Sequence, residues 1–187
     1  MDKVFPVDAP SLADLAARTN AILCRDGLPN RFATLVYVEM APGSGHLRIL
    51  NAGHPPPLLL SAGRGSADSA PAGRDAPPAP PASPDAFRVS EMPHGSMALG
   101  FLPDAPFVEQ AVEILPGETL IIYSDGVTEA MNTQGDFFGD DRFRSALPAL
   151  ARLPVADLGG HVVDAVDRFV RDARPHDDLS LIVMRRA

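Results

Sequence analysis

A short apolar run, Leu120-Ile121-Ile122-Tyr123, leads directly into Ser124-Asp125-Gly126. An apolar run of this length that ends on a turn signal predicts a buried strand. Asp125 would stand where the chain leaves the sheet, and Gly126 would let the backbone turn because it has no Cβ. A carboxylate that a core strand holds in place suits a hard divalent cation. The run therefore predicts a sheet with a ligand position at the end of one of its strands.

A second acidic sequence, Asp177-Asp178, comes just before the apolar run of residues 179–183. Taken singly, each acidic sequence is typical of an ordinary turn or a solvated cap. Two acidic positions at strand ends in one small chain favour a shared, oxygen-rich metal site. A third run, Asn51-Ala52-Gly53-His54-Pro55, precedes both in the sequence and strengthens this interpretation.

Length and charge limit the classes of function. A chain of 187 residues that is 45% apolar can bury the core of a single domain, which we expect to span residues 1–187. The net charge of −8 argues against a nucleic-acid partner, because no basic stripe is present to neutralise phosphates.

The single cysteine, Cys24, cannot form an internal disulfide and is expected to pack in a helix. No apolar run reaches the ~20 residues of a membrane span, and the first residues lack a signal-peptide pattern. We therefore expect a cytoplasmic protein without a membrane partner.

The predicted elements are mostly strands that follow one another directly. Ser11 is expected to cap a helix that ends at Asp26-Gly27. Its inward face is predicted to hold Leu12, Leu15, Ala16, Thr19, Ile22 and Leu23. Strands are predicted at 32–40, 46–51, 58–60, 87–90, 107–114, 118–124 and 179–184, and helices at 143–150 and 155–172. Such an order predicts antiparallel pairing and an α+β fold.

Residues 61–86 differ from the rest of the chain. They are rich in Ala, Gly, Pro and Ser and almost free of large apolar side chains. Such a composition buries too little surface to offset the entropy lost on ordering. We predict a disordered insertion at a surface hairpin.

Six short motifs together resemble a known family. They are Phe32-Ala33-Thr34-Leu35, Asn51-Ala52-Gly53-His54-Pro55, Ala98-Leu99-Gly100, Leu115-Pro116-Gly117-Glu118, Tyr123-Ser124-Asp125-Gly126-Val127-Thr128-Glu129-Ala130 and Asp177-Asp178-Leu179-Ser180. In this order they resemble the SpoIIE/RsbU class of PPM-type (protein phosphatase 2C-like) serine/threonine phosphatases. The resemblance extends from about Leu12 to Met184 and implies two packed antiparallel β-sheets flanked by helices (αββα).

The resemblance also implies a reaction and its residues. These enzymes hydrolyse phosphoserine or phosphothreonine with two Mn²⁺ or Mg²⁺ ions, which activate a bridging water and neutralise phosphoryl oxygens. Asp125 is then expected to be a direct metal ligand and Asp177 the second, with Asp178 as the alternative to Asp177. Gly126 would permit the turn, Asn51 would support the site, and Glu129 would cap a helix over residues 128–131. His54 is either a general acid or a residue that orders the nearby backbone.

A zinc site is excluded by the histidine spacing. His46, His54, His94, His161 and His176 show no zinc-binding pattern, and carboxylate ligands suit Mn²⁺ or Mg²⁺ better.

The sequence also departs from the family pattern. Such domains usually begin with a Gly-Gly-Asp-Phe-Tyr-Asp-like strand and an Asp-Val-x-Gly-His-Gly turn, and Asp2, Asp8 and Asp14 stand in no such context. We therefore expect an N-terminally incomplete fold and an incomplete metal site. From this we predict weak Mn²⁺ binding, little phosphatase activity, and marginal stability or self-association through an exposed sheet edge.

Two functions remain open on the sequence. The first is a phosphatase acting on a phosphorylated regulatory protein, for which the resemblance suggests an anti-sigma-factor antagonist. The second is a catalytically inactive fragment or interaction module of the same fold. An unrelated metal-binding β-sandwich would require the motif series to be a coincidence.

Overall fold

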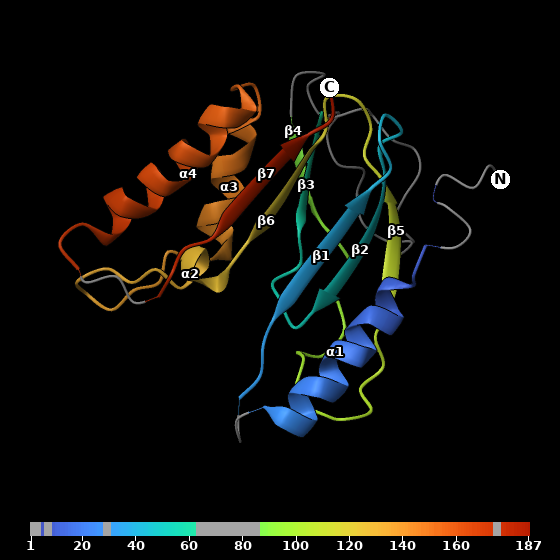
Figure 1. Ribbon diagram of the computed structural model, residues 1–187. Helices are drawn as coiled ribbons and strands as arrows, with labels where there is room; N and C mark the ends of the chain where they lie inside the picture. Colours follow the sequence, from blue (N-terminus) through green and yellow to red (C-terminus); the bar gives the residue numbers. More distant parts are fainter. Residues whose placement is uncertain (1–4, 6–8, 28–30, 63–86, 174–176) are drawn as a thin grey trace, which may run out of the picture.

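The computed structural model describes residues 5, 9–27, 31–62, 87–173 and 177–187 (Figure 1). Seven strands and four helices are assigned within these residues. They are α1 (Leu12–Asp26), β1 (Leu35–Met40), β2 (His46–Ala52), β3 (Leu58–Ala62), β4 (Phe87–Glu91), β5 (Glu109–Glu113), β6 (Thr119–Tyr123), α2 (Asp125–Thr128), α3 (Asp140–Leu150), α4 (Val155–Val170) and β7 (Leu181–Arg185).

The strands form two antiparallel sheets, and all neighbouring strands pair antiparallel. The first sheet has the order β1-β2-β5 and the second the order β4-β3-β6-β7. In the second sheet Ile121 of β6 lies opposite Leu58 of β3 and Val183 of β7, which fixes the register around the central strand. The predicted α+β fold class with two packed antiparallel sheets is confirmed.

Strand β6 is buried along its whole length, as its apolar run predicts. Because side chains alternate across a strand, Leu120 and Ile122 pack against the first sheet, where they join Leu47 and Ile49 of β2. Ile121 and Tyr123 point the other way, into the core beneath the helices. Burying one such side chain fully stabilises the fold by about 1.5–3 kcal/mol, so the last residue of β6 is held firmly before the chain reaches Asp125.

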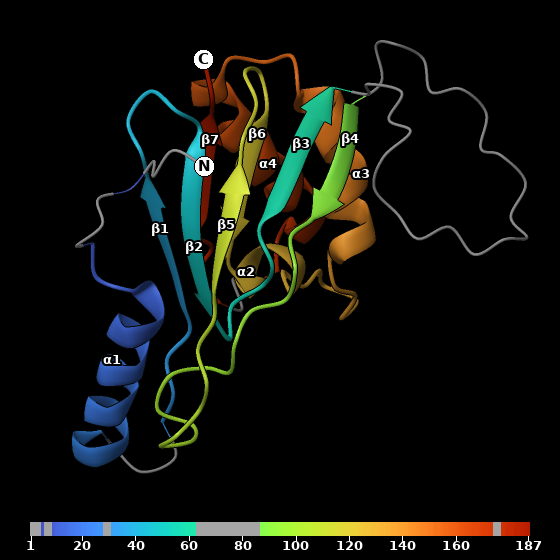
Figure 2. The same ribbon diagram turned by 90° about the vertical axis from the view of Figure 1, so that its right-hand side faces the viewer.

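The helices cover the sheets unequally. Helices α3 and α4 pack on the outer face of the second sheet (Figure 1) through Phe143, Leu147, Leu158, Val162 and Val166. Helix α1 lies over the lower end of the first sheet (Figure 2), where Leu12 and Ala16 contact Leu50 and Ala52 of β2. None of the described helices combines the length and the apolar character needed to cross a membrane.

The inward face predicted for α1 is partly wrong. The bounds agree with the prediction, and the Ser11 hydroxyl accepts a hydrogen bond from the Asp14 amide. Leu15 and Ile22, however, are 44% and 54% exposed. The buried stripe is instead Leu12, Ala16 and Asn20. Because α1 packs against one sheet, its buried face is narrower than the spacing of its apolar residues predicts.

Two further boundaries need correction. Ser61 and Ala62 belong to β3, where they pair with Arg88 and Phe87, so the predicted insertion does not begin at residue 61. The rest of that prediction, residues 63–86, lies outside the described residues. Glu129 does not cap a helix over residues 128–131, because α2 already begins at Asp125 and Glu129 is its C-cap. Ala130 then accepts a hydrogen bond from the Phe138 amide, which takes the chain out of the helix.

Candidate functional site

The two acidic sequences predicted to form a metal site meet at the ends of neighbouring strands. The last residue of β6 pairs with the first of β7, and the contact continues beyond the strands through Ser124. The Ser124 amide donates to the Ser180 carbonyl oxygen at 2.9 Å. The Ser124 hydroxyl accepts from the Ser180 amide at 2.9 Å and donates to the Asp178 carbonyl oxygen at 3.2 Å. The segments that carry Asp125 and Asp178, far apart in the sequence, are therefore joined through one serine.

Gly126 allows a close approach between the same two segments. It is buried in the first turn of α2, directly against the backbone of Asp178. A Cβ at this position would overlap the Asp178 carbonyl oxygen and lie 2.9 Å from the carbonyl carbon. The glycine in the Asp-Gly pair thus serves more than the turn after β6, since only a residue without a side chain lets the Asp178 backbone come this near to Asp125.

A rigid turn after β2 forms the third wall of the site. The buried Asn51 side chain accepts from the His54 amide and donates to the His54 carbonyl oxygen, both at 3.0 Å. Gly53 has a positive φ of 71°. A Cβ there would lie 2.6 Å from the Cβ of Ala98. The side chain of Asn51 therefore holds the turn that carries His54.

His54 lies between the two sheets and faces the acidic end of β6. Its Nδ1 lies 3.2 Å from the Thr34 hydroxyl oxygen. Partial burial lowers the pKa of His54, while the negative charge of Asp125 and a hydrogen bond with the Tyr123 backbone act to raise it. The imidazole is thus close enough to Asp125 for an electrostatic interaction between the two side chains. Either role predicted for His54, an acid or an organiser of the backbone, is compatible with this position.

A small hollow marks where these residues converge. It has a volume of about 220 Å³ and is lined by residues of β1, β6 and β7 together with His54, Ser124 and Ser180. Its lining is mainly apolar and includes the polar side chains of His54, Ser124 and Ser180, an arrangement common in binding sites.

The acidic side chains at this end of the sheets are Asp125, Asp177 and Asp178. Asp125 and Asp178 are on adjoining backbone segments, and Asp177 accepts a hydrogen bond from the Asp178 amide at 2.8 Å. Among the residues that the structure describes, no group of three or more His, Cys, Asp or Glu side chains is placed to hold a metal ion. A hard cation takes six or more oxygen ligands, part of them from carboxylates. The described carboxylates by themselves therefore do not make up a two-metal site.

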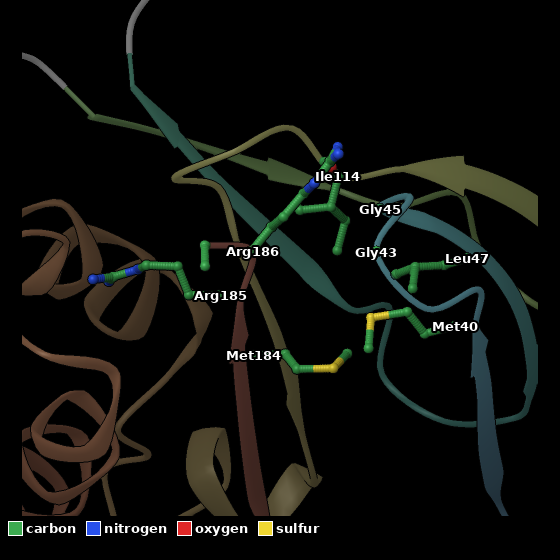
Figure 3. A pocket seen from close by; sticks show the side chains of 9 residues that line it. Met40, Gly43, Gly45, Leu47, Ile114, Met184, Arg185 and Arg186 are labelled. Carbon is green, nitrogen blue, oxygen red and sulfur yellow. The ribbon is translucent and has the colours of Figure 1, made fainter.

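A larger cavity lies at the opposite end of the sheets (Figure 3). It has a volume of about 320 Å³ and is lined by Met40, Leu47, Ile114 and Met184, with the Gly43–Gly45 turn and the last residues of the chain. Met40 and Met184 extend toward each other from β1 and β7, whereas Arg185 points away toward the helices. The side chains that line it include no carboxylate.

Sequence reasoning missed two residues of the site. Ser124 joins the two acidic segments, and Thr34 positions His54. Both lie inside the quoted motifs, Phe32-Ala33-Thr34-Leu35 and Tyr123-Ser124-Asp125-Gly126, but their partners are 20 or more residues away in the sequence. Only the fold shows why a hydroxyl stands at these positions. His176 and Asp2 and Asp8 lie outside the described residues, and Asp14 is in the first turn of α1.

Comparison with known proteins identifies the family and the fold. Residues 3–187 match the sequence profile of the family described as Stage II sporulation protein E (SpoIIE). Protein IcfG of Synechocystis is 28% identical over 158 residues, which are 83% of this chain and 21% of that protein. The chain thus spans about a fifth of the length of this curated relative.

Solved structures share the fold. The RsbU and RsbW domains of Rv1364c from Mycobacterium tuberculosis superpose with a TM-score of 0.66 at 19% identity, over 96% of this chain and 43% of that one. The SiaA-PP2C domain of Pseudomonas aeruginosa gives 0.60 at 17% identity, over 93% and 69%. The phosphatase domain of SpoIIE from Bacillus subtilis gives 0.58 at 17% identity, over 96% and 68%.

The profile match covers nearly the whole chain, and the sheet architecture agrees with that of the solved relatives. The resemblance drawn from the six motifs is confirmed. The chain belongs to the SpoIIE family of PPM-type (PP2C-like) phosphatases, in its SpoIIE/RsbU class.

Proposed function

We propose that this chain provides part of the catalytic centre of a metal-dependent protein serine/threonine phosphatase. One observation carries the proposal: Ser124 and Gly126 bring the backbone of Asp178 against the segment that carries Asp125. In this proposal Asp125 is a metal ligand and Asp177 a second ligand, with Asp178 as the alternative. Mn²⁺ or Mg²⁺ bound there would activate water and neutralise phosphoryl oxygens. Further carboxylates must come from outside the described residues.

The substrate in this proposal is a phosphorylated regulatory protein in the cytoplasm, and the resemblance to the RsbU class suggests an anti-sigma-factor antagonist. Support comes from the solved relatives, which include a SpoIIE phosphatase domain, a PP2C domain and an RsbU domain with an RsbW domain in the same protein. The chain's own contribution is structural and electrostatic: it fixes one or two carboxylates at strand ends and holds His54 beside them.

The test compares metal binding with turnover. Calorimetry measures Mn²⁺ affinity, and phosphate release from a phosphoserine peptide measures activity, first for the 187-residue chain and then with a separate polypeptide that carries the family's acidic N-terminal motifs. We expect weak binding and little release from the chain alone, and a rise in both when the second polypeptide is added.

Asp125→Asn supplies the decisive variant. Loss of an outer-shell partner already costs about 10–100-fold in metal affinity or activity, so loss of a direct ligand is expected to cost more. Asp164→Asn, on the exposed side of α4, is the matched control and should change neither quantity. Equal Mn²⁺ affinity in Asp125→Asn and the unaltered chain would refute the ligand assignment.

A second function has one observation in its favour. The described residues lack a cluster of three metal-binding side chains, as expected for an interaction module that has the family surface without its metal centre. This alternative predicts that a phosphoprotein binds equally well to Asp125→Asn and that no metal or added polypeptide produces turnover. The same set of measurements separates the two functions.

A further inference from the structure

The two aromatic side chains with the highest exposed fractions among the described residues lie together. Phe32 and Phe101 are 62% and 65% exposed, with ring centroids 6.3 Å apart in an edge-to-face arrangement. Met97 and Leu102, from the same loop as Phe101, are 45% and 49% exposed. We call the ring pair Phe32 and Phe101 the Phe32–Phe101 patch. Contiguous exposed apolar side chains of this kind mark surfaces that bind a partner.

The backbone beneath the patch is fixed. Ala33 and Leu99 exchange two hydrogen bonds of 2.9 Å, which tie the segment before β1 to the loop of residues 96–103. The fully buried Asn20 of α1 accepts from the Gly100 amide and donates to the carbonyl oxygens of Leu102 and Pro103. A loop that is held so firmly and yet presents aromatic rings to solvent is preorganised for contact, because little entropy remains to be lost on binding.

The same backbone connects the patch to the site. Thr34, whose hydroxyl contacts His54, is two residues from Phe32, and two residues of extended chain span about 7 Å. On the other side, the Gly53 amide donates to the Ser96 carbonyl oxygen at 2.8 Å. Both views of the ribbon place the loop at the end of the sheets where α2 lies (Figures 1 and 2). The backbone of the patch is therefore continuous with the segments that hold His54 near Asp125.

We propose that the Phe32–Phe101 patch is the docking surface for an aliphatic segment of the phosphoprotein substrate, next to its phosphorylated residue. The proposal rests on the proposed function, and it adds that substrate choice depends on apolar contact away from the phosphate. Arg31, the exposed residue before Phe32 in the sequence, adds one positive charge to this segment, which suits an anionic phosphoprotein.

The test measures binding without turnover. The probes are synthetic phosphoserine peptides of equal charge in which a pair of leucines is moved one position at a time away from the phosphoserine. A parallel set has serines in place of the leucines. Fluorescence anisotropy in EDTA gives each affinity and prevents hydrolysis. At one spacing the leucine peptide is expected to bind about tenfold more tightly than its serine partner, the size of a typical interface anchor.

Substitutions then show which side chains cause the tighter binding of the leucine peptide. Phe32→Ala and Phe101→Ala should each remove most of it, whereas Phe101→Leu should retain part because the side chain stays apolar. Met40→Ala is the control, because Met40 is 54% exposed at the far end of β1. Its preference should equal that of the unaltered chain. Thermal unfolding of each variant establishes that it is folded, and solvent-exposed rings should be removable with little loss of stability.

Two outcomes overturn the docking surface: equal affinity for leucine and serine peptides at every spacing, or a preference that survives in both Phe→Ala variants. Failure of the proposed function is seen separately. It would appear as no phosphate release when Mn²⁺ and the complementing polypeptide are added, whatever the affinities measured in EDTA.

Discussion

Gly126 shows how a single residue decides the geometry of the site. Its backbone lies against the Asp178 carbonyl group, and a methyl group there would overlap the oxygen. We predict that Gly126→Ala lowers the free energy of unfolding by about 1–3 kcal/mol, the usual cost of overpacking a rigid contact. Gly160→Ala is the matched control. Gly160 is exposed in α4 with open space around it, so alanine should stabilise the helix by about 0.5–1 kcal/mol. Chemical denaturation measures both, and equal effects of the two substitutions would contradict the contact.

The same residues show what the sequence can reveal at this scale. The Asp-Gly pair after an apolar run correctly locates the end of β6, because burial and turn chemistry are local properties. The overlap of Gly126 with Asp178 depends on a partner 52 positions away, as the numbering shows. The bond between Thr34 and His54 likewise depends on how two strands are aligned. No local pattern encodes such distances, so these contacts could not be predicted.

At the scale of elements, α1 and the loop of residues 96–103 act as one unit through Asn20. The side chain is fully buried and makes three hydrogen bonds with that loop, at 2.8, 2.9 and 2.8 Å. Asn20→Ala leaves these backbone groups without partners, which we expect to cost about 1–3 kcal/mol of stability. Hydrogen exchange of the Gly100 amide should accelerate in this variant. Thr19→Ala, in the same helix, removes only an exposed bond to the Leu15 carbonyl oxygen and should leave Gly100 protected.

Predictions of element boundaries were correct where a local signal marks the boundary, as at the Ser11 cap and the Pro42–Gly45 turn. They were wrong where a tertiary contact sets the boundary. Helix α1 has apolar residues on two sides, and the pattern alone cannot tell which side meets the sheet. Asn20 was missed because a polar residue on an apolar stripe has no signal of burial. Glu129 was misplaced for a related reason: α2 ends early because Ala130 pairs with Phe138, a contact formed by the following loop.

At the scale of the whole molecule, the edges β1 and β7 form one flank between the two sheets of the described residues. Among the described residues, β1 pairs only with β2, and β7 pairs only with β6, so both are edge strands. The two hollows, of about 320 and 220 Å³, are each lined by residues of both β1 and β7, which places these edges on the same side. Unpaired strand edges beside an apolar gap favour addition of a strand from another molecule.

We therefore predict that the 187-residue chain self-associates through this flank. Sedimentation velocity should show an average mass that rises with protein concentration. It should rise further with added salt, because screening weakens the repulsion between molecules of net charge −8 while apolar contact persists.

Ile182, 58% exposed on β7, is the residue to change. Ile182→Lys should weaken association by about tenfold, since a charge on an edge strand opposes strand addition. Val108→Lys, 62% exposed beside β5 at the opposite edge of the first sheet, should leave association unchanged. A monomer at every concentration and salt level, with a sharp and reversible thermal transition, would show that the flank is closed in solution.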